Sequence, residues 1–299
     1  MSFSAPQGLI APPLTPFNDD GSVATDLFVD HAHSLLDQGC VALAPFGTTG
    51  EALSVGIDER ISGLEALVEA GVDPHDLIPG TGLTNLPDTL RLTRHAIDSG
   101  CRAVMTLPPF YIKGPSDDGL VAYFEQLIEG AGTDDINIVL YHIPQVSGVG
   151  FSVELVARLR REFPGQIVGI KDSSGDWSNT QRLFKVEGLT VFPGSELPLV
   201  EALELGASGC ISATANINAV AISSVINTYR QRGAAAAIEP HGAVRDARLF
   251  AQQYEVVPAQ KAYLARRLAE PRWANVRPPI VPIAPELAEE FDDGFSAIS

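Results

Sequence analysis

The chain contains 299 residues with a mass of 31.8 kDa, and 45% of its residues are hydrophobic and 19% charged. This composition is typical of a globular enzyme and excludes a disordered or collagen-like chain. With 37 acidic against 20 basic residues, the formal net charge of -17 repels phosphate backbones and anionic lipid, which argues against a nucleic-acid or membrane partner.

Short apolar runs alternate along the chain with longer segments of helical periodicity. Eight runs rich in Val, Ile and Leu are predicted to be strands, at Leu9–Pro13, Val41–Phe46, Leu77–Gly80, Ala103–Leu107, Ile136–Tyr141, Ile167–Ile170, Thr190–Phe192 and Cys210–Ala213. The predicted helices between them span Thr25–Gln38, Asp58–Ala70, Leu86–Ser99, Ser116–Glu129, Ser152–Arg161, Asp176–Val186 and Glu196–Leu205. Three more helices and then a proline-rich tail are predicted after the last strand, with the helices at Ile217–Arg232, Ala234–Gln253 and Pro258–Ala269.

This alternation predicts an α/β fold, a (β/α)8 TIM barrel with an extra C-terminal helical part. Strands that are apolar on both faces belong in parallel sheets covered by helices, and about 250 residues is the usual size of a closed barrel. We therefore expect the barrel at 1–214 and a helical extension packed on it at 215–299. The alternative, a doubly wound sheet that binds a dinucleotide, would carry Gly-x-Gly-x-x-Gly after its first strand, and residues 9–17 contain nothing like it.

Lys171 is the most unusual residue at a predicted strand end. It is one of only four lysines and directly follows the apolar run Ile167–Ile170. Catalytic groups of a parallel barrel come from the carboxyl ends of its strands. An ammonium at the top of a barrel core loses hydration, which favours the neutral amine that can form a Schiff base with a ketone. On spacing alone, an ion pair with Asp172 remains the alternative.

Polar groups also follow other predicted strands. The segment Gly47-Thr-Thr-Gly-Glu51 offers two hydroxyls and several backbone N–H groups between two glycines. Such a loop can hold a carboxylate, and an ordinary turn in which a threonine caps the next helix is equally compatible with it. Tyr141 and Tyr111 both fall at strand ends, where a phenol can either relay a proton or pack as a half-buried side chain.

Four motifs at strand ends occur in one order and spacing: Gly47-Thr-Thr-Gly-Glu51, Pro109-Phe-Tyr111, Tyr141-His-Ile-Pro144 and Gly169-Ile-Lys-Asp172. Together they resemble the dihydrodipicolinate synthase / N-acetylneuraminate lyase family, and the similarity extends over essentially the whole chain. The resemblance implies a (β/α)8 barrel, usually a tetramer, that acts on 2-oxo acids as a class I aldolase, lyase, synthase or dehydratase. The covalent imine takes the place of a cofactor in this chemistry.

The resemblance also implies roles for individual residues. Lys171 would form the imine with pyruvate or a longer 2-oxo acid, Tyr141 would be the general acid and base, and Thr48 would relay the proton. Tyr111 would enter the site of a neighbouring subunit, which implies a homo-oligomer built as a dimer of dimers. The implied substrate-binding residues are Gly47, Thr49, Ser173, Gly194, Glu196 and Ile211.

Two departures from the family's patterns bear on the substrate. Val146 stands where dihydrodipicolinate synthases usually carry an arginine that binds the second substrate's carboxylate. A bound charge left unpaired costs about 2–5 kcal/mol, so lysine biosynthesis is disfavoured. Sialic acid lyases carry an Asp-Glu pair after the glycine of the seventh strand, and here Glu196 remains whereas Leu197 replaces the second carboxylate.

We therefore expect a lyase that cleaves a 2-oxo-3-deoxy sugar acid, or a similar 4-hydroxy-2-oxo acid, to pyruvate and an aldehyde. Dehydration of such an acid through the same imine is a close second reading. A dihydrodipicolinate synthase that binds aspartate semialdehyde without the usual arginine is the main alternative. A catalytically silent protein that senses a 2-oxo acid is a further alternative.

The rest of the sequence indicates no metal site and no disulfide framework. Cys40, Cys101 and Cys210 lie far apart, without a Cys-x-x-Cys pair. No apolar run reaches the ~20 residues of a membrane span, and the first residues lack the basic and apolar regions of a signal peptide. These features predict a cytoplasmic enzyme.

Overall fold

The computed structural model describes residues 4–133 and 135–298. Within these residues it forms two parallel sheets, with strand orders β2-β1-β7 and β3-β4-β5-β6. The strands are β1 (Gly8–Ala11), β2 (Cys40–Leu43), β3 (Val104–Thr106), β4 (Ile138–His142), β5 (Ile167–Asp172), β6 (Thr190–Pro193) and β7 (Gly209–Ile211).

The predicted strand Leu77–Gly80 lies between the two sheets without forming a regular strand. Isolated parallel bridges join its ends to β2 and β3. Pro79 has no N–H to donate, and a Cβ on Gly80 would collide with the carbonyl of Phe46, so the segment approaches its neighbours closely but pairs only in part. With β6 against β7, eight parallel segments surround one axis. The predicted (β/α)8 barrel is confirmed.

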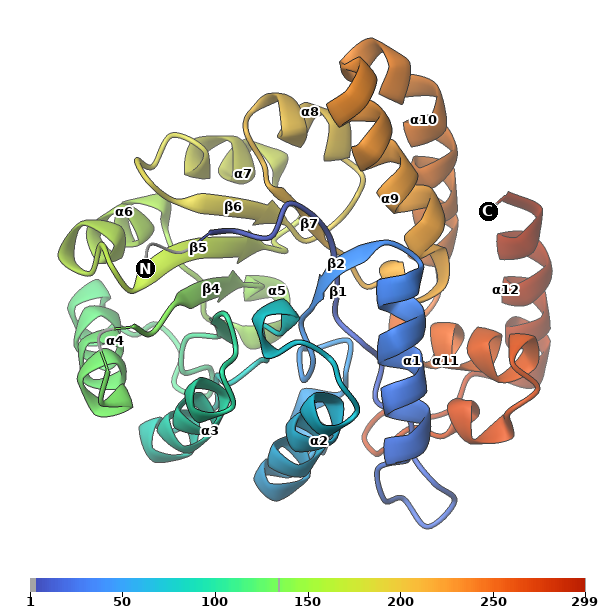
Figure 1. Ribbon diagram of the computed structural model, residues 1–299, viewed down its shortest axis with the longest axis horizontal. Coiled ribbons are helices and arrows are strands. Elements are labelled where there is room, and N and C mark those ends of the chain that lie inside the picture. Colours follow the sequence, from blue (N-terminus) through green and yellow to red (C-terminus); the bar gives the residue numbers. More distant parts are fainter. Residues whose placement is uncertain (1–3, 134, 299) are drawn as a thin grey trace.

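Helices follow the strands in the predicted order (Figure 1). They are α1 (Thr25–Asp37), α2 (Ile57–Glu69), α3 (Leu86–Asp98), α4 (Asp117–Ala131), α5 (Pro144–Ser147), α6 (Val153–Glu162), α7 (Trp177–Leu183), α8 (Leu199–Glu204), α9 (Ala215–Arg232), α10 (Ala234–Ala251), α11 (Val256–Arg267) and α12 (Pro285–Ile298). Short 3-10 helices are η1 (Ala52–Ser54), η2 (Pro74–Asp76) and η3 (Pro271–Ala274). Figure 1 shows α10–α12 gathered on one side of the barrel, near α1 and α9.

Two layers of apolar side chains form the core. The smaller cluster fills the barrel interior and includes Val139 and Val168, whereas the larger one lies between strands and helices and includes Leu140 and Ile170. Neighbouring residues of a strand point to opposite faces. Tyr141 and Lys171, which follow the outward-facing Leu140 and Ile170, therefore point into the barrel at the carboxyl ends of β4 and β5.

Asn216, in the first turn of α9, joins the first and last parts of the barrel. Its Oδ1 accepts a hydrogen bond from the backbone N–H of Leu14 at 3.0 Å and lies 2.8 Å from Nε2 of His31, while its Nδ2 donates to the carbonyl of Pro12 at 3.0 Å. Burial lowers the pKa of His31 to about 4, so the imidazole is neutral at pH 7. Helix α9 packs against both β1 and α10, and the domain division after residue 214 stays a prediction.

The prediction of a proline-rich tail is wrong for its second half, because residues 285–298 form α12. Phe291 and Phe295 are fully buried and stacked, with ring centroids 5.5 Å apart, and they pack against aromatic rings of α10 and α11. Pro285 fits the first turn of a helix, where no N–H partner is needed. A helix this short depends on the surface it packs against, which sequence periodicity does not display.

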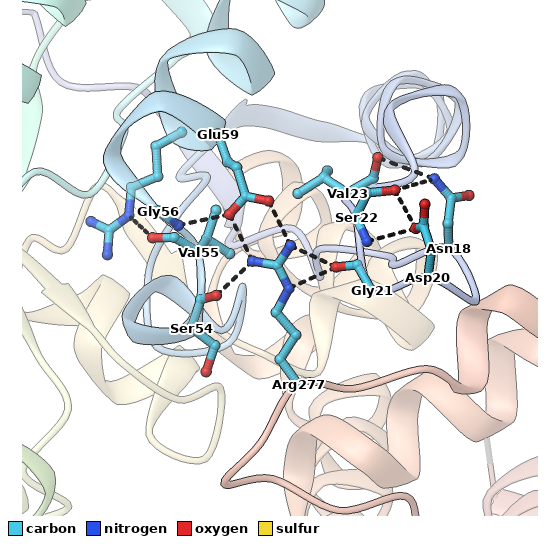
Figure 2. A network of polar contacts seen from close by, with 11 residues as sticks. Asn18, Asp20, Gly21, Ser22, Val23, Ser54, Val55, Gly56, Glu59 and Arg277 are labelled. Atoms are coloured by element: carbon cyan, nitrogen blue, oxygen red, sulfur yellow. Dashed lines mark hydrogen bonds and ion pairs between the residues drawn. The ribbon is translucent and has the colours of Figure 1, made fainter.

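Arg277, in the segment between η3 and α12, connects that segment to helix α2 and to one loop of the barrel. Figure 2 shows its guanidinium between Glu59 of α2 and the loop at residues 18–23. Nη1 and Nη2 lie 2.7 and 2.5 Å from the two carboxylate oxygens of Glu59, and Nη2 donates to the carbonyl of Gly21 at 2.6 Å. This pairing holds the pKa of the Glu59 carboxyl below its usual value. The C-terminal segment thus braces the amino end of α2.

Candidate active site

Lys171 and Tyr141 lie side by side at the open end of the barrel because β4 and β5 pair Tyr141 directly with Lys171. The Lys171 Nζ sits 4.4 Å above the centroid of the Tyr141 ring. Both side chains are only 4% exposed. A lysine held over an aromatic face keeps its orientation without a carboxylate partner.

Asp172 does not form the alternative ion pair with Lys171. Its carboxylate accepts hydrogen bonds from Thr180 Oγ1 at 2.8 Å, Asn179 Nδ2 at 3.1 Å and the backbone N–H of Ser174 at 2.9 Å. Within residues 4–133 and 135–298, no carboxylate lies within ion-pair distance of Lys171. Its amine is therefore free to react with a ligand.

Thr48 lies next to the phenol of Tyr141. The Thr48 Oγ1 and the Tyr141 hydroxyl are 3.1 Å apart, which is hydrogen-bond distance. Thr49, one residue further along the loop after β2, is buried with its side chain against the same cavity. The hydroxyls of Thr48 and Tyr141 can pass a proton between a substrate bound to Lys171 and the loop after β2.

These residues line a cavity of about 710 Å³ at the carboxyl ends of the strands. Of the residues predicted for substrate binding, Thr49, Ser173 and Gly194 line it. Gly194 is required there, because a Cβ at this position would collide with Ser173 Oγ. Gln145 of α5 also lines the cavity, and its Nε2 donates to the carbonyl of Ser173 at 2.7 Å.

Three residues implied by the resemblance lie outside this cavity. Gly47 lines an adjoining cavity of about 240 Å³, which shares Thr48 and Tyr141 with the first. Ile211 is fully buried in the barrel interior. Glu196 is also fully buried, and its carboxylate accepts a hydrogen bond from Ser212 Oγ. The Glu196 carboxylate therefore does not line the cavity, and it is not placed to bind the hydroxyl groups of a polyol ligand there.

Tyr111 is the most separated of the predicted catalytic residues. It lies in the loop between β3 and α4, is 82% exposed and lines neither cavity. Its neighbour Ile112 is 74% exposed. Two large apolar side chains side by side on one exposed loop are typical of a surface that another chain covers.

The C-terminal helices contribute cavity residues that the motifs did not indicate. Arg245 and Arg248 from α10, Gln252 directly after it and Val257 from α11 all line the cavity. The only local signal is that Arg245 and Arg248 are three residues apart and so share a helix face. Nothing in the sequence indicates that this face turns toward the barrel.

A second buried lysine contacts Glu51, in the loop that carries Thr48. Lys261 of α11 is 0% exposed, forms an ion pair with Glu51 and donates to the carbonyl of Asn275 at 2.7 Å. Glu51 adopts a left-handed backbone conformation with φ of 52°. Burial lowers the pKa of Lys261 to about 8, while the negative charge of Glu51 acts in the opposite direction.

Within the part of the chain that the structure describes, no group of three or more His, Cys, Asp or Glu residues is placed to hold a metal ion. Among the same residues, no helix combines the length and the apolar character needed to cross a bilayer.

Comparison with known proteins places this site in a family. Residues 5–298 match the dihydrodipicolinate synthetase family. The chain is 36% identical over 284 residues to an uncharacterized DapA-like lyase of Chloroflexus aurantiacus, covering 94% of this chain and 93% of that protein. It is also 36% identical to dihydrodipicolinate synthase from Agrobacterium tumefaciens str. C58, with a TM-score of 0.85 and coverage of 98% and 99%.

A further solved structure is that of YagE, a prophage protein from E. coli K12 in complex with pyruvate. It is 25% identical to this chain, has a TM-score of 0.88 and covers 98% of each chain. The match of the family over residues 5–298 and the two relatives at 36% identity lead to one conclusion. The chain belongs to the dihydrodipicolinate synthetase family and is a lyase with that family's TIM-barrel fold.

Proposed function

We propose that this lyase forms a Schiff base between Lys171 and pyruvate or a longer 2-oxo acid. Its substrate is a 2-oxo-3-deoxy sugar acid or a similar 4-hydroxy-2-oxo acid, which it cleaves or dehydrates. The observation that carries the proposal is the chain of contacts from Lys171 to the ring of Tyr141, and from the Tyr141 hydroxyl to Thr48. All three residues line one cavity.

In the proposed reaction, the Lys171 amine attacks the C2 ketone of the substrate to form a carbinolamine. Tyr141 donates a proton to the departing hydroxyl, and water leaves as the protonated imine forms. The Tyr141 phenolate then takes the proton of the C4 hydroxyl while the C3–C4 bond breaks. The electron pair of the broken C3–C4 bond moves into the protonated imine, which gives an enamine and an aldehyde. Protonation of the enamine and hydrolysis of the imine release pyruvate.

The Thr48–Thr49 loop is the part of the site suited to the substrate's C1 carboxylate. Thr48 Oγ1 is exposed to the cavity, and the Thr49 side chain lines it. Hydroxyls and N–H groups of such a loop can bind a carboxylate without a cation. With the carboxylate held by the loop, the C2 ketone falls next to Lys171.

A dihydrodipicolinate synthase is the second candidate, favoured by the name of the relative from Agrobacterium tumefaciens. Val146 in α5 is 59% exposed and lines the cavity. An arginine at this position, as the family's synthases usually carry, would bind a second carboxylate there. Valine cannot form that contact, which is why the sugar-acid reaction is preferred.

We further propose that the site is completed by Tyr111 of a second copy in a homo-oligomer. The support is that Tyr111 and Ile112 are exposed on one loop, while the other predicted catalytic residues, Lys171, Tyr141 and Thr48, line the cavity. Hybrids of inactive Tyr111→Phe and inactive Lys171→Ala subunits should regain activity, because one of the two kinds of site would then be intact. Hybrids that are verified by mass and remain inactive would argue against a shared site.

The test of the Schiff base is reduction with borohydride in the presence of pyruvate, followed by peptide mass spectrometry. We expect one adduct, on Lys171, and none in Lys171→Met. No adduct, with a known class I aldolase trapped in parallel, would contradict the proposal. Release of pyruvate from 2-oxo-3-deoxy acids, measured with lactate dehydrogenase, then separates cleavage from dehydration, which releases none.

A further inference from the structure

Arg245 and Arg248 of α10 both line the cavity that holds Lys171. Arg248 Nη1 donates to Thr214 Oγ1 at 2.9 Å, and Arg245 Nη1 donates to the carbonyl of Leu197 at 3.0 Å. These neutral acceptors fix each guanidinium against the cavity wall. They leave the positive charges uncompensated.

Neither arginine forms an ion pair with a carboxylate among the described residues. The Arg248 Nε is buried and has no hydrogen-bond partner there. A buried N–H without an acceptor destabilises the fold. What distinguishes Arg248 among the described arginines is that this unpartnered Nε belongs to a side chain that lines the cavity.

The charges around the cavity favour a negatively charged ligand. Lys171, Arg245 and Arg248 line it, together with two acidic residues. One of these, Asp172, is buried and accepts hydrogen bonds from its own strand end and α7. The other, Glu201, is exposed. The acidic excess of the whole chain, 37 acidic against 20 basic residues, is thus absent among the residues that line the cavity.

We propose that Arg248, assisted by Arg245, binds a second oxyanion group of the substrate, a carboxylate or a phosphate, at the end opposite C1. The inference rests on the proposed function, which assigns the C1 carboxylate to the Thr48–Thr49 loop and the C2 ketone to Lys171. A guanidinium matches the planar oxygens of a carboxylate or the oxygens of a phosphate. The cavity volume of about 710 Å³ accommodates a chain of five or six carbons.

The position of these arginines also explains the departure at Val146. The family's synthases usually bind a second carboxylate through an arginine there, and this chain has an exposed valine in α5. Helix α10 supplies guanidinium groups to the same cavity from the C-terminal extension. The second anionic group would then bind against α10 rather than α5, which selects a different substrate shape.

Binding of 2-oxo acids that lack a C4 hydroxyl, and so can form the imine but cannot be cleaved or dehydrated, tests this site without relying on turnover. The probes are 2-oxohexanoate, which has an apolar end, 2-oxoadipate, which has a carboxylate there, and a 2-oxo acid of similar length with a terminal phosphate ester. Calorimetry on the intact protein should show that one anionic ligand binds about thirtyfold more tightly than 2-oxohexanoate. The tighter of the two anionic ligands identifies the group. Equal affinities for all three would overturn the proposal.

The variant Arg248→Met should abolish that preference and leave the affinity for 2-oxohexanoate within about threefold of the original. Arg245→Met should reduce the preference for the anionic ligand less, about fivefold, because Arg245 is more exposed than Arg248. Arg232→Met is the matched control, because Arg232 is exposed at the end of α9. It should bind all three ligands as the unaltered protein does.

A role of Arg248 in packing alone would predict a different result. Both the apolar and the anionic ligands would then weaken equally in Arg248→Met, and this outcome would overturn the proposal. Trapping of pyruvate on Lys171 with borohydride in Arg248→Met verifies that the rest of the site is intact. Failure of trapping in the unaltered protein would count against the proposed function, whereas equal ligand affinities would count against the arginine site alone.

Discussion

Two buried lysines, Lys171 and Lys261, lie in opposite electrostatic surroundings. Lys261 is paired with Glu51, donates to the carbonyl of Asn275 and sits 4.3 Å from the centroid of the Phe17 ring. Lys171 lies over the ring of Tyr141 at a similar distance, 4.4 Å, but has no carboxylate partner among the described residues. The aromatic contact is common to both lysines, and the ion pair is what separates them.

This difference indicates which lysine can react. The ion pair and the second hydrogen bond occupy the Lys261 ammonium, and Lys261 lines neither of the two cavities at the open end of the barrel. The Lys171 amine opens onto a cavity, next to hydroxyls that can transfer protons. Burial alone therefore does not identify a nucleophile. The proposal of Lys171 as the nucleophile rests on two further features, the absence of an ion pair among the described residues and the position at the wall of a cavity.

The same contrast extends to the arginines of the two regions. Arg277, in the C-terminal segment, forms a bidentate ion pair with Glu59. Arg245 and Arg248, at the cavity, bind only neutral acceptors. The charge of Arg277 is thus compensated by a carboxylate, whereas Arg245 and Arg248 keep positive charge available for a ligand at the cavity.

The largest expected effect comes from removing the amine at the cavity. Lys171→Met should lower kcat at least about a thousandfold, because no imine can form. Its free energy of unfolding should change by less than about 1 kcal/mol, because no ion pair among the described residues is lost and methionine has a similar size. Kinetics and chemical denaturation measure the two quantities. Lys185→Met, on an exposed residue, serves as the control, and near-normal turnover in Lys171→Met would end the Schiff-base assignment.

The matching change at the second lysine should affect stability. Lys261→Met leaves the Glu51 carboxylate buried and unpaired, and we expect a loss of about 3–5 kcal/mol in the free energy of unfolding. The double variant Glu51→Gln with Lys261→Met should recover most of that loss, because no unpaired charge remains. Urea denaturation of the three proteins gives the values. A double variant no more stable than Lys261→Met would show that the ion pair is not what Lys261 contributes.

A smaller effect is expected at the proton-transfer group. Tyr141→Phe removes the hydroxyl that lies 3.1 Å from Thr48 Oγ1, and kcat should fall about a hundredfold. The ring beneath Lys171 remains, so borohydride should still trap pyruvate on Lys171, although more slowly. Comparison of kcat with the extent of trapping separates the two roles. Equal loss of both would mean that Tyr141 positions the lysine rather than transferring protons.

The smallest expected effect is on the pH dependence of the free energy of unfolding. It concerns the contact between α1, α9 and η3. The His31 imidazole contacts Asn216 and the ring of Trp273, and burial lowers its pKa from 6.5 to about 4. As the pH falls, the His31 imidazole of the unfolded chain therefore takes up a proton before that of the folded chain. The stability that depends on neutral His31 is present above about pH 6.5 and is lost as the pH falls toward 4. At pH 5 this loss should amount to about 2 kcal/mol.

Denaturation of His31→Asn at pH 7 and pH 5 tests this value. The variant is expected to be less stable at pH 7, because a smaller side chain leaves a cavity beside Trp273. Its additional loss between pH 7 and pH 5 should be about 2 kcal/mol less than that of the unaltered protein, since Asn does not titrate. The same pH dependence in both proteins would assign the acid sensitivity to other groups.

Much of the barrel, and the position of the proposed nucleophile at its open end, followed from the sequence. Apolar strands before glycine-rich loops predict a parallel sheet, and the period of two along β4 points Tyr141 inward. In β5 the pairing with β4 shifts by one residue between Ile138 and Val139, so a strict period of two does not assign the direction of Lys171. Both residues lie at the carboxyl ends of their strands. Lys171 and Tyr141 therefore had to lie at one end of the barrel, whatever the details of the loops. The four motifs added the order in which the catalytic residues occur.

Tertiary structure alone decided the surroundings of those groups. Whether Lys171 pairs with Asp172 depends on α7, whose Asn179 and Thr180 occupy that carboxylate. The packing of α12 depends on an aromatic surface made by two other helices. The entry of Arg248 into the cavity depends on how α10 docks against the barrel. Local sequence determines which face a residue occupies, whereas its partners come from segments distant in the chain, and the energies of those contacts exist only once the segments meet.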